Sequence, residues 1–234
     1  MKKIVSLILI GVMSMAMFAG CQGFAAKADL APPPNADGLW YAPKVTSDAA
    51  KAEKNIEATR KILMVIDMQV DFVDGALGTP EAVAIVPNVI EKIKSYDPAD
   101  VYATLDTHFE ENYFDTQEGI KLPVLHCVKD SPGWQLYAGI DELIPEDHRF
   151  IKYTFGSLDV QQFIMDLAAK EDIEVEFIGL CTDICVVSNA MLAKASVPSM
   201  AITVDASCCA GVSVPTHEAA LDTMATCQMN VINR

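Results

Sequence analysis

Basic residues are scarce in this chain. Its 234 residues include 17 lysines and arginines against 32 aspartates and glutamates, which gives a formal net charge of −15. Binding to a phosphate backbone depends on clustered lysine and arginine, so this balance argues against a nucleic-acid surface. We attribute the acidity to solubility rather than to cationic ligands.

Long hydrophobic runs are equally scarce, and the one at the N-terminus has the features of an export signal. Two lysines precede an apolar, uncharged stretch at residues 4–18, which is short for a membrane span. Small residues then precede Cys21, as in a lipoprotein cleavage box. We expect residues 1–20 to be a signal peptide, with a lipidated Cys21 anchoring the exported protein to a membrane and facing the periplasm or cell exterior. Cleavage nearby, with release of a soluble product, is the alternative.

Residues 21–60 lack any strong apolar period. They are rich in alanine and proline and then polar, which is typical of a linker or tether. Residues 61–234 follow as one stretch long enough to bury a sizeable core, and they show no internal repeat. We therefore expect a single folded domain whose contact with the membrane is made through Cys21 alone.

The cysteines do not indicate a disulfide framework. Cys21 aside, six remain, at positions 127, 181, 185, 208, 209 and 227. An even number in an exported protein favours pairing. However, five of the six lie in or beside apolar runs, where a free cysteine packs as a small hydrophobe. Cys208 and Cys209 are adjacent, so a bond between them would close a strained ring.

Short apolar runs alternate with helical periods from residue 61 to the end. We expect helices in a segment whose first turn contains Pro87, after a cap at Ser157, and at residues 182–195 and 216–226. Residues 109–150 otherwise read as loops around a site. The alternation predicts parallel βαβ units, and hence an α/β, three-layer Rossmann-like fold with a mostly parallel central sheet and helices on both faces. The expected strands are residues 62–66, 100–105, 123–127, 150–153, 172–180, 199–204 and 229–232.

Three chemically active side chains follow or end expected strands. Asp67 follows the first strand, Lys152 lies in the strand at 150–153, and Cys185 follows the strand at 172–180. The carboxyl ends of parallel strands form the ligand crevice of an open sheet. A carboxylate, an ammonium and a thiol gathered there would form an acid/base pair around a nucleophile.

Cys185 would lie in the first turn of a helix. A thiol there feels the positive end of the helix dipole, which favours the thiolate, and the free N–H groups of that turn can bind an oxyanion. Cys181 lies one turn earlier and competes for the same role. Position alone does not separate the two, and both are also compatible with buried packing thiols.

A second group of side chains suggests a metal site. Asp106 and His108 are two residues apart at a strand end and so point to the same side, and His126 ends another short apolar run. One carboxylate and two imidazoles suit a divalent transition metal with open positions. His148 and His217 have no comparable neighbours, and we expect them to be structural.

The residues at these positions carry a resemblance to a known family, the isochorismatase-like cysteine hydrolases. The segment Asp67-Met-Gln-Val-Asp-Phe72 is similar to the opening motif of that family, and Gly179-Leu-Cys-Thr-Asp-Ile-Cys-Val186 is similar to its nucleophile segment. Asp106-Thr-His108 with His126-Cys-Val128 resembles the metal-containing branch typified by nicotinamidase. The resemblance covers residues 61–232.

The resemblance implies a role for each catalytic residue. Cys185 would be the nucleophile, Asp67 the proton acceptor and later donor, and Lys152 the cation that stabilises both as anions. Backbone N–H groups of Cys181 and Cys185 would form the oxyanion hole, after a cis peptide bond between Leu180 and Cys181.

The same resemblance implies a cofactor and a substrate. Asp106, His108 and His126 would bind a divalent metal (Zn, Mn or Fe), and the metal would take the ring nitrogen of nicotinamide, with Phe72 beside the ring. The expected activity is that of an amidohydrolase on linear amides, converting nicotinamide to nicotinate and ammonia as in pyridine nucleotide biosynthesis.

Three departures from the branch leave the substrate open. Thr107 and Pro123 stand where nicotinamidases usually have tryptophan, and Asn112 and Phe114 occupy the stretch after His108 where a further histidine is often found. Trp134 is either another source of an aromatic wall or a core or surface residue. The alternatives are a cysteine amidohydrolase for an N-carbamoyl or ureido compound, or a lipoprotein that binds a ligand without turnover. The sequence also leaves open whether the chain forms a homo-oligomer.

Overall fold

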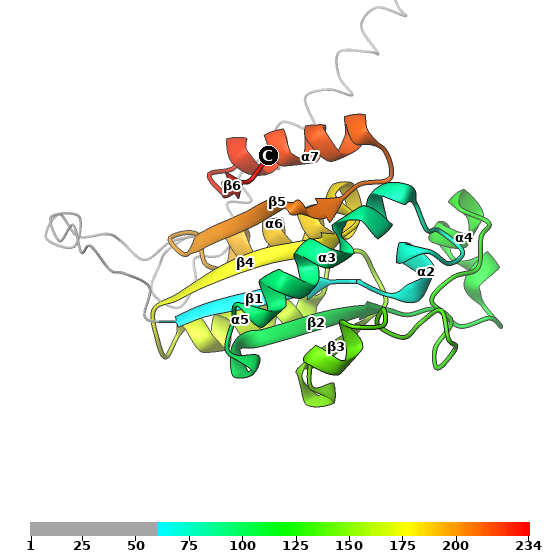
Figure 1. Cartoon of the computed structure of the whole chain (residues 1–234), viewed down its shortest axis with the longest axis horizontal. Helices are drawn as coiled ribbons and strands as arrows, with labels where there is room; N and C mark the ends of the chain where they lie inside the picture. The colour runs from blue at the N-terminus through cyan, green and yellow to red at the C-terminus, as the bar shows by residue number, and fades with distance from the viewer. Residues whose placement is uncertain (1–59) are drawn as a thin grey trace, which may run out of the picture. The chain divides into compact units, whose positions relative to one another are not determined.

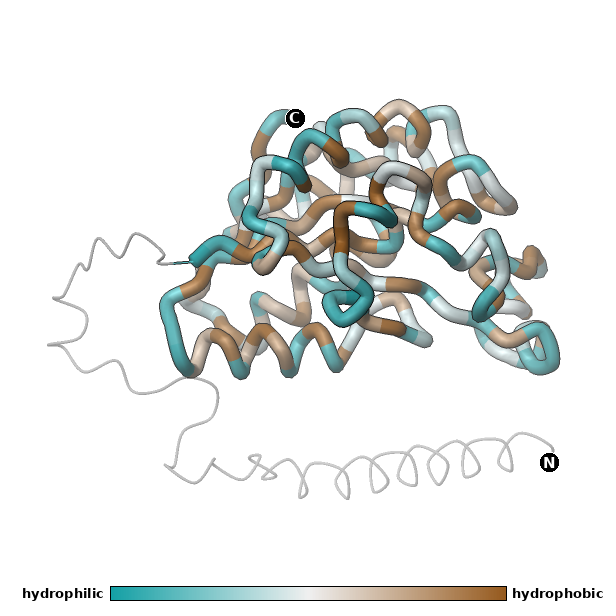
Figure 2. The backbone as a smooth tube through the Cα atoms, turned by 60° about the horizontal axis from the view of Figure 1, so that its bottom comes forward, coloured by the Kyte–Doolittle hydropathy of each residue, from teal (hydrophilic) through white to brown (hydrophobic). Residues whose placement is uncertain are grey.

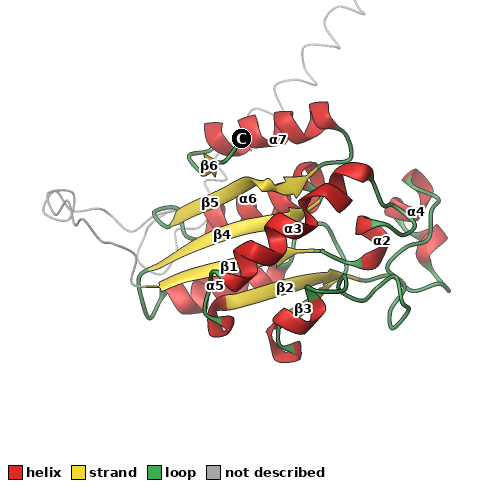
Figure 3. Cartoon of the chain, in the orientation of Figure 1, coloured by secondary structure: helices red, strands yellow, loops and turns green. Residues whose placement is uncertain are grey.

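The structure, a computed structural model, describes residues 60–234 as a parallel sheet with helices on both faces (Figures 1 and 3). Its six strands run in the order β3-β2-β1-β4-β5-β6, and all neighbours are parallel. This confirms the Rossmann-like α/β prediction. The strands are β1 (Arg60–Ile66), β2 (Val101–Asp106), β3 (Arg149–Lys152), β4 (Ile173–Leu180), β5 (Ala201–Ala210) and β6 (Asn230–Ile232).

The strand order reverses between β1 and β4. The chain winds outward from β1 through β2 to β3, and then returns to the other side of β1 as β4. In open sheets of this kind, ligands bind outside the carboxyl ends of the strands at the point of reversal. Residues that follow β1 and β4 therefore flank the expected binding crevice.

The central strand β1 is apolar on both of its faces. Residues 62–66 are fully buried, because helices cover the sheet on each side. In Figure 1, α3 (Pro80–Lys94) crosses one face, and α5 (Leu158–Ala168) and α6 (Val187–Ser196) lie behind the sheet. The last helix, α7 (Val214–Thr226), contacts α6 and β6. Figure 2 shows the hydrophobic segments running through the interior.

Helix α3 begins earlier than the sequence suggested. The Thr79 hydroxyl accepts the N–H of Ala82 and Pro80 occupies the first turn, so Pro87 lies inside the helix rather than at its start. Proline in the interior removes a backbone donor, a cost that the buried face of this helix offsets. The expected cap at Ser157 is confirmed, since its side chain accepts the N–H of Val160.

The expected strand at residues 123–127 is wrong. Pro123 has no N–H to donate, and Cys127 adopts a positive φ of 44°, which an extended strand does not allow. A single bridge between His108 and Val128 joins this segment to the end of β2. The remaining short elements are α2 (Val70–Val73), η1 (Pro98–Asp100), η2 (Tyr113–Asp115), α4 (Gln117–Lys121), η3 (Asp141–Leu143), η4 (Glu146–His148) and η5 (Thr182–Val186).

Gly179 allows the ends of β1 and β4 to approach closely. It has a φ of +114°, and a Cβ atom there would lie 2.1 Å from the carbonyl oxygen of Ile66. Only glycine fits this backbone without displacing the neighbouring strand. The approach brings the residues that follow β1 next to those that follow β4.

The predicted signal peptide, the lipidated Cys21 and most of the tether lie outside the described residues, and they stay predictions. None of the helices within residues 60–234 has the length and apolar character needed to cross a membrane. The six cysteines of this part are all free in the structure.

Candidate active site

The ends of three strands bring Asp67, Lys152 and Cys185 together. The Lys152 ammonium lies 2.8 Å from Asp67 Oδ2 and 3.6 Å from the Cys185 sulfur. All three side chains are buried, with 0%, 2% and 5% of their surface exposed. The carboxylate, ammonium and thiol therefore interact out of bulk water, where electrostatic interactions are strongest.

Thr104 orients the Asp67 carboxylate. Asp67 has a positive φ of 45°, and its N–H donates to the Thr104 hydroxyl oxygen at 3.1 Å. The same hydroxyl donates to Asp67 Oδ1 at 2.6 Å. Within residues 60–234, Asp67 Oδ2 has the ion pair with Lys152 but no aligned hydrogen bond. Thr104 therefore holds Oδ1, and Oδ2 is the carboxylate oxygen that faces the Lys152 ammonium.

The three groups shift one another's pKa values. Burial raises the pKa of Asp67, although the nearby Lys152 charge opposes the rise. Burial acts to lower the pKa of Lys152, but the charges of Asp67, Cys185 and Asp106 outweigh it and raise that pKa well above its ordinary value. Burial and the Asp67 charge raise the pKa of Cys185. Burial and the Asp67 charge thus oppose ionisation of the Cys185 thiol, whereas the Lys152 charge favours it, and the expected thiolate stays a prediction.

The local geometry separates Cys185 from Cys181. Strand β4 ends at a cis peptide bond between Leu180 and Cys181, at the place that the family resemblance implied. Cys181 precedes the π-helical turn η5, and Cys185 lies within it. The Lys152 ammonium bonds to the Cys185 sulfur, and in the described part of the chain no such bond reaches Cys181. Burial and the Asp183 charge raise the pKa of Cys181 to about 12.

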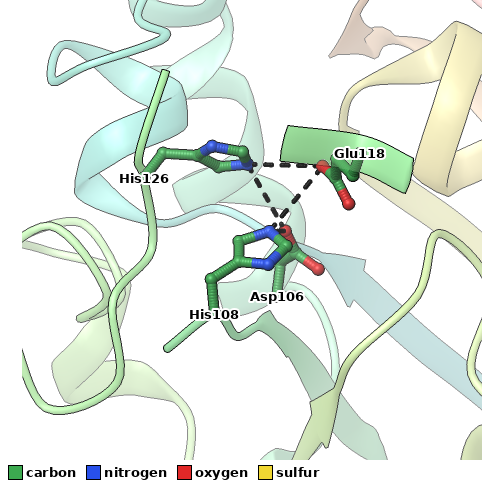
Figure 4. A group of neighbouring side chains, drawn as sticks. All are labelled: Asp106, His108, Glu118 and His126. Atoms are coloured by element: carbon green, nitrogen blue, oxygen red, sulfur yellow. Dashed lines mark hydrogen bonds and ion pairs between the residues drawn. The ribbon is translucent and has the colours of Figure 1, made fainter. Parts of the chain in front are cut away.

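Asp106, His108 and His126 converge as expected, and Glu118 joins them (Figure 4). Each residue offers one ligand atom, and these atoms all lie within 4.8 Å of one another. His108 Nε2 is 3.0 Å from Asp106 Oδ2, and Glu118 Oε1 is 3.7 Å from His108 Nε2 and 3.6 Å from His126 Nε2. Glu118 is half-buried, whereas the other three are buried.

This donor set fits a divalent transition metal. Two imidazoles and two carboxylates suit Zn²⁺, Mn²⁺ or Fe²⁺. His126 Nδ1 lies 2.8 Å from the carbonyl oxygen of Val124, a contact that would leave Nε2 to face the cluster. Gln69 holds the backbone of Asp106 from both sides, donating to its carbonyl and accepting its N–H. These outer hydrogen bonds are of the kind that fix metal ligands in place.

Asp106 links the two groups of side chains. Its Oδ2 faces the histidines, while its Oδ1 accepts a bond of 2.8 Å from the Lys152 ammonium. Burial acts to raise the pKa of Asp106, but its bonds to His108, His126 and Lys152 lower that pKa far below the ordinary value. The carboxylate is therefore ionised and can serve as a ligand.

Glu118 was not predicted from the sequence. It lies in the segment read as irregular loop, where Glu110, Glu111 and Asp115 are closer to His108 in the sequence than Glu118 is. The short helix α4, capped by Thr116, turns Glu118 toward the histidines. A carboxylate between the two histidines was available as a signal, but nothing local distinguished it from the other three.

Cys185 and the four residues of the metal cluster line one cavity of about 830 Å³, and Asp67 and Lys152 lie behind Cys185 and Asp106. Phe72 also lines it, and its ring meets the ring of His126 edge-on with the centroids 5.3 Å apart. Trp134 is not among the lining residues, because its indole N–H donates to the Thr107 hydroxyl at 2.7 Å.

The other two histidines take no part in the metal cluster. His148 Nδ1 lies 2.8 Å from the carbonyl oxygen of Val101, and its ring stacks on Tyr102. His217 Nδ1 lies 2.8 Å from the hydroxyl of Thr182, next to the nucleophile turn. The expectation of structural roles agrees with these contacts, although His217 is closer to the site than expected.

Comparisons with known proteins give a consistent result. A family model described as the isochorismatase domain matches residues 61–234. The nicotinamidase/pyrazinamidase of Bacillus subtilis is similar in structure, with a TM-score of 0.63 and 24% identity over 74% of this chain and 98% of that one. The pyrazinamidase of Pyrococcus horikoshii, solved in complex with zinc, gives 0.61 and 25% over 74% and 99%. The pyrazinamidase/nicotinamidase of Streptococcus mutans gives 0.62 and 26% over 74% and 99%. No protein with curated annotation matches the chain by sequence.

Proposed function

The chain belongs to the isochorismatase family, and from that premise we propose that it hydrolyses a small carboxamide, with nicotinamide as the model substrate, to a carboxylate and ammonia. One observation carries the proposal: a single ammonium, that of Lys152, lies 2.8 Å from the Asp67 carboxylate and 3.6 Å from the sulfur of Cys185, which lines a cavity. That is the arrangement an activated nucleophile requires.

The first half of the reaction acylates Cys185. Asp67 takes the thiol proton as the sulfur attacks the amide carbon, and backbone N–H groups of Cys181 and Cys185 bind the oxygen that becomes negative. Asp67 then gives its proton to the leaving nitrogen, the carbon–nitrogen bond breaks, and ammonia departs. A thioester remains on Cys185. Because the pKa of Asp67 is raised, its carboxylate is a stronger base than an exposed aspartate and is better matched to a thiol.

The second half hydrolyses the thioester. Asp67, again ionised, takes a proton from a water molecule that attacks the acyl carbon. The carbon–sulfur bond breaks, the carboxylic acid leaves, and the sulfur regains a proton. Lys152 stays charged throughout and stabilises the anions that form on either side of it.

The cluster of Asp106, His108, Glu118 and His126 would hold a divalent metal, and a bound metal would supply a Lewis-acid position for the ring nitrogen of the substrate. Phe72 would pack against the ring beside His126. This cluster favours a ring amide over an N-carbamoyl or ureido compound, which has no ring nitrogen to present.

An amide panel tests the proposal. We expect equal amounts of acid and ammonia from nicotinamide and pyrazinamide, a loss of activity after a chelator, and its return with added Zn²⁺, Mn²⁺ or Fe²⁺. Product would be measured by chromatography and ammonia by a coupled assay. Faster turnover of an N-carbamoyl compound, unaffected by the chelator, would refute the pyridine carboxamide assignment while leaving the cysteine chemistry intact.

Replacing Thr104 with valine should change the pKa of Asp67, the proposed base. The change removes the hydroxyl that donates to Asp67 Oδ1, and that hydrogen bond lowers the pKa of Asp67. The pKa of Asp67 should then rise further, so the acidic limb of the kcat/KM profile should move to higher pH. Loss of a bond to a charged group also predicts a fall in kcat/KM of about ten- to a hundredfold.

The serine variant is the matched control, because Thr104→Ser keeps the hydroxyl and should restore both the rate and the pH profile. If Thr104→Val lowered activity equally at every pH, the role of Thr104 would be packing rather than orientation of the base.

A further inference from the structure

Cys185 and the metal cluster line only part of the cavity. Its volume of about 830 Å³ lies in the upper part of the range, about 300–1,000 Å³, that encloses drug-sized ligands. A pyridine carboxamide is one ring with one amide group, so it would leave much of this space unfilled. The unfilled part is a property of the site that the proposed amide hydrolysis does not explain.

The rest of the cavity wall is mostly apolar. Three large side chains on the wall are exposed: Tyr153 by 59%, Phe155 by 46% and Val212 by 60%. Ile184, beside the nucleophile, continues the apolar wall inward. Of the wall residues, all of which lie within residues 60–234, Lys121 is the only charged one outside the metal cluster. Beyond the amide and ring, an apolar part of a ligand would therefore fit this wall better than a charged part would.

Hydrogen bonds tie the apolar wall to the turn that contains the nucleophile. Asn189 donates both to the carbonyl of Cys185 at 2.8 Å and to the carbonyl of Phe155 at 3.1 Å. The carboxylate of Asp183, two residues before Cys185, accepts the N–H of Val212 at 3.1 and 3.2 Å from its two oxygens. Phe155 and Val212 therefore have backbone positions fixed relative to the reacting sulfur.

We propose that the natural substrate is an amphipathic carboxamide. Its amide lies at Cys185, and an alkyl or aryl arm runs past Ile184 and between Phe155 and Val212 toward the cavity mouth. This inference rests on the proposed amidase function and specifies the substrate class of the same site. Burial of the arm removes from water both the arm and the three exposed side chains, which is the source of its binding free energy.

Two series of nicotinamides test the inference, one with alkyl chains from methyl to hexyl on the amide nitrogen and one with the same chains on the ring. Release of the corresponding nicotinate is the common readout. We expect kcat/KM in one series to rise about fourfold per methylene until the cavity is filled, mainly through a lower KM. A fall or no change with chain length in both series would overturn the proposal.

Substitutions in the apolar cavity wall test where the alkyl chain binds. Phe155→Ser and Val212→Ser should reduce the ratio of kcat/KM for the hexyl compound to that for the parent amide. The matched control is Phe114→Ser, because Phe114 is 54% exposed but does not line the cavity, and it should leave the ratio unchanged. An equal effect of all three changes would contradict the assigned path.

Binding without turnover separates this inference from the proposed reaction. Calorimetry with the Cys185→Ala variant should show the hexyl amide of the productive series binding more tightly than nicotinamide. If no amide is hydrolysed by the intact enzyme yet this preference holds, the proposed function fails and the apolar subsite stands. If nicotinamide is hydrolysed but the hexyl compounds bind no better, the subsite fails and the proposed function stands.

Discussion

Cys185→Ala should abolish amide hydrolysis, with a fall in kcat of more than about 10⁴-fold. No other thiol in residues 60–234 has an ammonium within bonding distance, and the Lys152–Asp67 pair would remain without a nucleophile to activate. The fold should persist, since the change removes one sulfur atom from the site. Acid release would be measured alongside the circular dichroism spectrum and the metal content, both of which should be unchanged.

Cys181→Ala is the matched control. It removes the neighbouring thiol but keeps the backbone N–H that is proposed to bind the oxyanion, so activity should stay within about tenfold of the parent. Retained hydrolysis in Cys185→Ala, or its loss in Cys181→Ala alone, would reverse the assignment of the two cysteines.

The covalent intermediate gives an independent measurement. Mass spectrometry of a reaction quenched during turnover should find an acyl group on Cys185. Cys181 and Cys185 both lie between Lys170 and Lys194, so trypsin releases them in a single peptide. Fragmentation of that peptide is needed to show which cysteine carries the acyl group. An adduct on Cys181, or none with any hydrolysed amide, would contradict the thioester mechanism.

The convergence of Asp67, Lys152 and Cys185 could be predicted because the topology dictates it. Each residue lies at or after the end of a strand in a parallel sheet, and such ends meet at one edge. The pair Asp106 and His108 was predictable for a similar reason, since alternation along a strand places residues two apart on one side. Alternation along a strand, together with the meeting of parallel strand ends at one edge of a sheet, was therefore sufficient to bring these residues together.

Other features depend on tertiary contacts that no local pattern encodes. Glu118 reaches the histidines because α4 turns it inward. The sequence alone did not distinguish it as a metal ligand from the acidic residues near it. Burial beside Asp67 raises the pKa of Cys185, an effect that a reading based on the helix dipole omits. The apolar run before His126 suggested a strand, but Pro123 and the positive φ of Cys127 break its pairing.

His126→Ala should remove the metal while leaving the nucleophile in place. His126 is buried, and Glu118 Oε1 and Asp106 Oδ2 lie within 3.7 Å of its Nε2, so its loss opens one side of the cluster. Loss of an outer-shell partner alone costs about 10–100-fold in metal affinity, and loss of a ligand should cost more. Metal content after dialysis and competition with a chromogenic chelator would measure the change. Alkylation of Cys185 by iodoacetamide should proceed at the parental rate.

Glu118→Gln should weaken metal binding too, but by less than His126→Ala, because the amide oxygen keeps one weak donor and loses the charge. Glu111→Gln is the matched control, since Glu111 is exposed in the same segment and lies outside the cluster. Full metal occupancy in His126→Ala would refute the site. Equal affinities for Glu118→Gln and Glu111→Gln would remove Glu118 from the ligand set and leave Asp106, His108 and His126, the three residues that the sequence indicated.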